Sequence, residues 1–133
     1  MTTCQVTIPI GMKNVYDTYH CAPDFLISDT LYCSGQVGCD ENLNVIEGIA
    51  AQYVQAFENV AKVLDAAEVS FDDVIKLETW FAEDMGNLAT FVAEKDRYFT
   101  THFPTGTGFT VEGFSMPGTH LEIKCKAVPG RVQ

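Results

Sequence analysis

The sequence predicts an α+β fold in which two helices cover one face of a mixed sheet. Three observations lead to this class: helical hydrophobic spacing over 49–67, strict alternation over 74–81, and short β-prone runs towards both ends of the chain. The expected element order is β-β-α-β-α-β-β, with one further strand near the N-terminus. Because helices would cover only one sheet face, the other face needs a partner, and homo-oligomerisation is expected.

The first half of the chain predicts a strand pair followed by the longest helix. Residues 4–8 alternate weakly and end at a proline. The runs 25–27 and 31–35 are joined by the polar triplet 28–30, which predicts a hairpin. Over 49–67 the apolar residues recur three or four positions apart, so they fall on one face of a helix.

The second half predicts a turn, a strand, a second helix and two more strands. These elements are expected at 70–73, 74–81, about 87–101, 107–114 and 119–128. Asp84 is the expected cap of the second helix. Pro104 is expected to end that helix, because proline lacks an N–H and clashes with the preceding turn. The Pro-Gly pair within 115–118 predicts the turn before the last strand.

The composition predicts one globular domain spanning residues 1–133. Of the 133 residues 47% are hydrophobic, which is enough for one sizeable core. The net charge of −10 disfavours nucleic acid and anionic membrane surfaces as partners. The five cysteines show no C-x-x-C spacing, and the sequence has neither a standard signal peptide nor a membrane-length apolar run. A reduced, cytoplasmic protein is therefore expected.

Common catalytic signatures are absent from the sequence, so neither a metal nor a cofactor is expected. Gly106-Thr107-Gly108 is too short for a phosphate-binding loop and favours a β-bulge or a close backbone approach. His20 and Cys21 are adjacent, which points their side chains to opposite sides of an extended chain and disfavours a catalytic dyad.

The carboxylate of Glu122 is the most informative polar group in the predicted sheet. Alternation places it with Lys124 on the strand face opposite three apolar residues. A carboxylate in mid-sheet is costly unless it is paired or used. It therefore forms an ion pair with Lys124 or Lys76, or it belongs to a functional site.

Ser34, Gly35 and Gln36 bring three polar groups to the end of a predicted strand. A hydroxyl, an unhindered backbone N–H and a side-chain amide lie close together there, and such a cluster can polarise a bound carbonyl or imine. A simple turn at the end of the strand explains the same residues equally well.

The whole chain resembles the Rid (YjgF) family over about residues 12–128. The runs that carry the resemblance are 31–36 (LYCSGQ), 52–67, 70–76 (SFDDVIK), 103–105 (FPT) and 121–127 (LEIKCKA). The resemblance implies a chorismate-mutase-like fold assembled as a homotrimeric barrel, with helices outside and sheets facing the centre. It also implies small-molecule sites in clefts between subunits.

The best-known members of this family are enamine/imine deaminases, which hydrolyse reactive 2-imino acids to 2-keto acids and ammonia. The resemblance implies that Glu122 positions or activates the attacking water and that Ser34 and Gly35 line the cleft. Either Tyr19 or His20 corresponds to the family's tyrosine in the N-terminal segment.

This chain departs from the family pattern at the substrate anchor. Where deaminases have Pro-x-Arg-x-Cys, this chain has Pro104-Thr105-Gly106-Thr107-Gly108, so the arginine that clamps the substrate carboxylate is missing. Loss of a charge-assisted clamp weakens binding by about ten- to more than a hundredfold. The cleft becomes roomier and more negative, which favours a neutral or cationic ligand. Alternatively, Lys124 binds the carboxylate of the substrate as a point charge.

These observations predict a cofactor-free hydrolase that releases ammonia from a small imine or related metabolite. Glu122 and Ser34 are the expected catalytic residues. The substrate-binding residues are expected to be Tyr19, His20, Gly35, Gln36, Gly106, Thr107, Gly108 and Lys124. The alternative is a noncatalytic small-molecule-binding or regulatory trimer. RNA cleavage, although the family also carries an endoribonuclease label, is the least favoured function because the chain is acidic and has no basic stripe.

Overall fold

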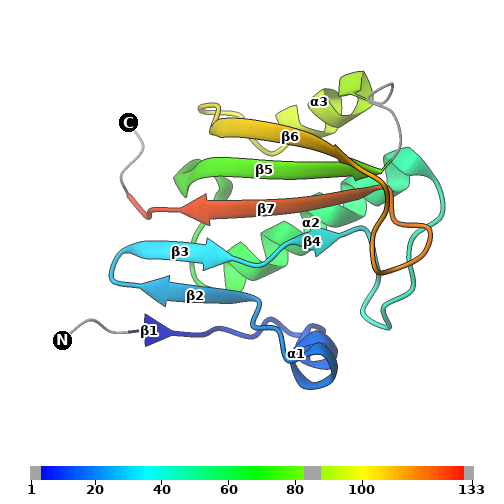
Figure 1. The fold of residues 1–133 in the computed structure, drawn as a ribbon. Coiled ribbons are helices and arrows are strands. Elements are labelled where there is room, and N and C mark those ends of the chain that lie inside the picture. The colour runs from blue at the N-terminus through cyan, green and yellow to red at the C-terminus, as the bar shows by residue number, and fades with distance from the viewer. Residues whose placement is uncertain (1–3, 83–87, 131–133) are drawn as a thin grey trace.

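The computed structural model describes residues 4–82 and 88–130, and Figure 1 shows the arrangement of their elements. The strands are β1 (Cys4–Gln5), β2 (Asp24–Ile27), β3 (Thr30–Cys33), β4 (Gln36–Val37), β5 (Val74–Ala82), β6 (Thr105–Val111) and β7 (Leu121–Ala127). The helices are α1 (Lys13–Tyr19), α2 (Ile49–Ala66), the 3-10 turn η1 (Phe71–Asp73) and α3 (Leu88–Asp96).

All seven strands form one mixed sheet, which confirms the predicted class, but the sheet has one strand more than the sequence predicts. Its order is β1-β2-β3-β7-β5-β6, and β4 pairs with β7 beyond the end of β3. Every pair is antiparallel except β5 and β6, which run parallel because α3 makes the crossover between them. β5 lies between β6 and β7, so the last two strands do not pair with each other.

Helices α2 and α3 cover one face of this sheet (Figure 1). The predicted helical face of α2 is confirmed, and its buried apolar residues are Tyr53, Ala56, Phe57, Val60, Val63 and Leu64. The α2 side chains meet alternate residues of β5 and β7, which are buried on the same side of the sheet. Phe91 of α3 stacks on Phe57 with ring centroids 5.9 Å apart, so the second helix adds to the same core.

The second helix is shorter than the periodicity predicts, and Pro104 does not end it. Helix α3 stops at Asp96, well before that proline. The reason is aromatic packing: the Tyr98 ring lies 4.9 Å from the ring of Phe57 and 5.0 Å from that of Phe71. Tyr98 therefore belongs to the core through the turn after the helix. The expected cap, Asp84, lies outside the described residues.

Two other boundaries differ from expectation. The strand predicted over 107–114 begins at Thr105, because parallel pairing with β5 already starts there, opposite Lys76. Helix α1 was not predicted, since it is short and buries none of its residues. The hairpin of β2 and β3 is confirmed, and so is the capped turn, in which the Ser70 hydroxyl accepts a hydrogen bond from the Asp72 N–H.

The second face of the sheet lies away from α2 and α3 (Figure 1). It carries partly exposed aromatic side chains. Phe109 is 46% exposed and stacks on Trp80 with ring centroids 6.0 Å apart. Tyr32 is 44% exposed, and the Lys126 ammonium lies 4.9 Å from its ring centroid. Within the described ranges, no helix is both long and apolar enough to span a membrane.

Candidate functional site

The strand β7 places Glu122 on the uncovered face of the sheet, as alternation predicts. Leu121, Ile123 and Cys125 are buried, whereas Glu122 and Lys124 face the other side. Glu122 pairs in register with Val37 of β4 on one side and with Trp80 of β5 on the other. Glu122 is therefore in the middle of the sheet, between β4 and β5.

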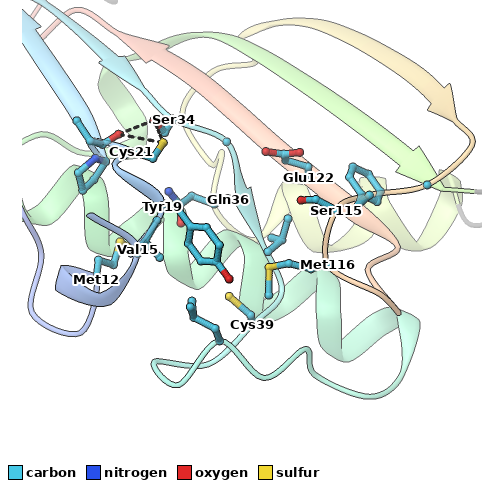
Figure 2. A pocket seen from close by; sticks show the side chains of 17 residues that line it. Met12, Val15, Tyr19, Cys21, Ser34, Gln36, Cys39, Ser115, Met116 and Glu122 are labelled. Carbon is cyan, nitrogen blue, oxygen red and sulfur yellow. Dashed lines mark hydrogen bonds between the residues drawn. The ribbon is translucent and has the colours of Figure 1, made fainter. Parts of the chain in front are cut away.

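A cavity of about 470 Å³ opens beside Glu122 (Figure 2). Its walls come from α1 and the segment after it, from the end of β3 with β4, and from the loop between β6 and β7. The lining residues are Met12, Val15, Tyr19, Cys21, Ala22, Pro23, Ser34, Gly35, Gln36, Val37, Cys39, Leu43, Gly113, Phe114, Ser115, Met116 and Glu122. A second, more open cavity of about 800 Å³ adjoins it on the sheet face and shares Glu122.

Glu122 is half-buried, and the charge of Lys124 is the only charge of a described residue that acts on its carboxyl. Burial raises the pKa of its carboxyl above the ordinary value, and the positive charge of Lys124 offsets part of this rise. Among the described residues it makes neither a hydrogen bond nor an ion pair, and Lys76 is instead 3.0 Å from Glu78. The ion pairs considered in the sequence analysis are thus not formed, and the carboxylate oxygens remain available to a ligand or water.

Gly35 lies against this carboxylate, and only glycine fits there without displacing it. A Cβ atom built on Gly35 would lie 2.1 Å from Oε1 and 2.8 Å from Cδ of Glu122. Gly35 therefore lets the strand end approach the carboxylate closely. In the structure, Gly35 is next to Glu122, and Ser34, Gly35 and Glu122 line the same cavity.

Ser34 lines both cavities, but its hydroxyl donates its hydrogen bond to another group of the protein and not towards a ligand. It donates a hydrogen bond to the carbonyl oxygen of Ala22 at 2.5 Å, and the Cys21 Sγ lies 3.6 Å from its Oγ (Figure 2). The Ser34 backbone N–H donates to the carbonyl of Pro23 at 2.8 Å. These bonds hold the segment after α1 against the end of β3, so the geometry gives Ser34 a positioning role. Its catalytic role remains a prediction.

Tyr19 and His20 border different cavities. Tyr19 extends towards Gln36 and Cys39 in the smaller cavity (Figure 2). His20, in a left-handed conformation with φ of 54° at the end of α1, lines the larger cavity instead. Lys124 lines the larger cavity and is absent from the lining of the smaller one. Both residues weighed for the N-terminal position are thus near Glu122, on two sides of it.

Gly106, Thr107 and Gly108 lie apart from both cavities within this chain. They belong to β6, the strand at the edge of the sheet, and β5 separates them from β7. A Cβ atom on Gly106 would meet no atom within 4 Å, so the close backbone approach expected for glycine here does not occur at that position. Their participation in a site remains a prediction that requires a second subunit.

Several lining residues were missed by the sequence analysis. Met12 and Val15 line the cavity from the start of α1, and the spacing of three and four residues that they form with the predicted Tyr19 is the helical signal that could have revealed them. Phe114 and Met116 come from the loop before β7 and carry no such signal. In the described part of the chain, no group of three potential metal ligands is present.

The sheet, the covering helices and the cavity beside Glu122 define an α+β protein with a half-buried carboxylate on the uncovered face of its sheet. The sequence pattern of the family described as Endoribonuclease L-PSP matches residues 17–129. The chain belongs to this family, which is the Rid (YjgF) family that the sequence resembles. The family includes proteins named as imine deaminases.

Named relatives and solved structures agree with this assignment. A human protein named 2-iminobutanoate/2-iminopropanoate deaminase is 31% identical over 107 residues, which cover 79% of this chain and 77% of the human protein. The solved structure of protein YJGH is 26% identical with a TM-score of 0.86, covering 93% of this chain and 95% of that chain. RidA from an Antarctic Psychrobacter is also 26% identical, with a TM-score of 0.76 and coverages of 81% and 87%.

Proposed function

We propose that this protein hydrolyses a small imine or enamine without a cofactor and releases ammonia. The observation that carries the proposal is the half-buried Glu122 carboxylate, which has no hydrogen-bond partner among the described residues and faces a cavity of about 470 Å³. The name of the human relative, an imine deaminase, supports the same reaction class. We infer that the substrate is not a simple 2-imino acid, because no arginine of the described residues lines either cavity beside Glu122.

The chemistry follows from the position of the carboxylate. Glu122 orients a water molecule and accepts its proton as the oxygen adds to the carbon of the C=N bond. The resulting carbinolamine loses ammonia when its nitrogen is protonated, and a carbonyl compound remains. A raised pKa suits this role, because it brings the carboxylate closer in basicity to neutral pH than an ordinary glutamate.

We also propose that the active assembly is a homotrimer in the cytoplasm. The uncovered sheet face, with Trp80, Phe109 and Tyr32 on it, supports burial against further copies of the chain. In such an assembly, Gly106, Thr107 and Gly108 of one subunit can line the cavity of the next subunit. The five cysteines are all free thiols, which is consistent with a reducing compartment. Measurement of the native mass by light scattering tests the assembly.

The reaction is tested by ammonia release from freshly generated imines with and without a carboxylate. Glu122→Gln keeps the shape of the side chain but removes the base, and we expect it to lower kcat by about 100-fold or more. The matched control is Glu47→Gln, an exposed carboxylate outside both cavities, which should turn over like the wild type. Equal turnover by Glu122→Gln and wild type would rule out the proposed mechanism.

A noncatalytic small-molecule-binding protein is the second candidate. It is favoured by the 470 Å³ cavity, whose lining contains no basic residue to hold the carboxylate of a 2-imino acid. In this case Glu122→Gln changes ligand affinity, while wild type releases no ammonia from any imine tested. Turnover that depends on Glu122 contradicts this alternative.

A further inference from the structure

The charge on the wall of the 470 Å³ cavity is unbalanced. Of its 17 lining residues, Glu122 is the only carboxylate, and none is lysine, arginine or histidine. Burial and the nearby Asp40 raise the pKa of the Cys39 thiol, so that group stays neutral near pH 7. The described arginine, Arg97, is bonded to Glu94 of α3 at 3.0 Å and is absent from both cavity linings. A ligand bound in this cavity therefore meets one negative charge and no cation on the same wall, because Lys124, whose charge acts on Glu122, lines the adjoining cavity instead.

The rest of the wall is mainly apolar. Met12, Val15 and Met116 supply hydrophobic surface to the cavity (Figure 2), and so do Leu43 and Phe114. A volume of about 470 Å³ lies within the range of pockets that bind compounds larger than a two- or three-carbon metabolite. Polar contacts besides Glu122 are offered by Gln36 and Ser115. The cavity thus suits an apolar group attached to a single polar centre.

We propose that the ligand of this cavity is an iminium or ammonium cation that carries an apolar substituent and no carboxylate. The proposal deepens the function proposed above and rests on it for the identity of the reacting bond. A carboxylate-bearing ligand would bring a second negative charge beside Glu122 in a half-buried, apolar setting. An iminium cation instead brings a positive charge into this cavity beside Glu122, and it is also the form of an imine that water attacks most readily.

The hydrolysis of such a substrate is balanced without any co-reactant. Water adds its oxygen to the iminium carbon and gives one proton to Glu122, which produces a neutral carbinolamine. Glu122 returns that proton to the nitrogen, and the C–N bond breaks with its electron pair leaving on ammonia. The carbinolamine hydroxyl loses its proton, so the products are a carbonyl compound and an ammonium ion. No oxidation or reduction occurs.

The test uses three stable probes of the same shape: cyclohexylamine, cyclohexanol and cyclohexanecarboxylate. Their binding to the full-length protein is measured by calorimetry at pH 7.5. We expect wild type to bind the ammonium probe at least about tenfold more tightly than the carboxylate probe. In Glu122→Gln the ammonium probe should lose this advantage and the carboxylate probe should bind more tightly than to wild type. Glu47→Gln should retain the wild-type order.

Tighter binding of the carboxylate probe by wild type would overturn the inference, and so would an unchanged preference for ammonium in Glu122→Gln. The binding assay also separates this inference from the proposed reaction. If the ammonium preference holds but no imine is hydrolysed, the ligand class stands and the hydrolase is refuted. If imines are hydrolysed with Glu122 but the carboxylate probe binds best, the hydrolase stands and the ligand class is refuted.

Discussion

The contact between Gly35 and Glu122 gives the sharpest prediction about the site. In Gly35→Ala, the new Cβ would lie 2.1 Å from the Glu122 Oε1, whereas relaxed non-bonded contacts of carbon lie near 3.5 Å. The carboxylate must therefore move by about 1 Å. Because Glu122 is a flexible side chain beside an open cavity, it can move without disturbing the sheet. The backbone at Gly35 is outside the left-handed region, so alanine is not strained there.

We expect Gly35→Ala to lower kcat/KM for imine hydrolysis by about 100-fold, since a displacement of 1 Å in a catalytic group has an effect of that size. The free energy of unfolding should change by less than about 1 kcal/mol. Ammonia release and urea denaturation measure the two quantities. The control is a double-mutant cycle: if Gly35→Ala acts through Glu122, adding it to Glu122→Ala should cause no further loss. Full additivity of the two effects, or wild-type activity in Gly35→Ala, would refute the reasoning.

Three other predictions concern stability. Burial raises the pKa of Glu122, so the stability linked to its protonation is present below its ordinary pKa and is lost as pH rises through the raised value. Glu122→Gln should therefore be more stable than wild type in urea at pH 7.5, with the difference disappearing near pH 4. Gly38→Ala should lower the unfolding free energy by about 1–3 kcal/mol, because its Cβ would lie 2.4 Å from the backbone carbonyl oxygen of Gln52, which cannot yield as a side chain does. Unchanged urea midpoints would contradict this. Asn59→Ala should cost about 1–3 kcal/mol and lower Tm, since the buried amide donates to two carbonyls of the segment 37–39 at 2.8 and 2.9 Å. A Tm within one degree of wild type would show that those carbonyls find other donors.

The sequence predicted best where periodicity is strong and local. The helix over 49–66 and the strand over 74–82 follow directly from hydrophobic spacing, because each buries one face against the same core. The second helix was predicted too long, since Tyr98 is apolar at a helical position but reaches the core from a turn. Helix α1 was missed because it buries none of its residues and therefore lacks a pronounced hydrophobic face.

The candidate site was only partly predictable for a similar reason. The residue Glu122 stood out because a carboxylate in the middle of a strand is costly, and this argument needs only the alternation of the strand. The wall contributed by α1 carries only a short helical spacing, and the wall contributed by the loop at 113–116 carries no local pattern. These two segments form one cavity only because the fold packs both of them beside β4, although they are about 100 residues apart in the chain.

The sequence by itself determined the α+β class, the alternation of β7 and the acidic, arginine-poor character of the chain. These properties depend on the order and type of neighbouring residues, which the sequence contains completely. Only the tertiary structure decided that Gly35 touches Glu122 and that the Ser34 hydroxyl donates its hydrogen bond to the Ala22 carbonyl. It also decided that, among the described residues, no cation lines the 470 Å³ cavity. Such contacts join segments far apart in the chain, and they arise from strand register and packing that no local pattern encodes.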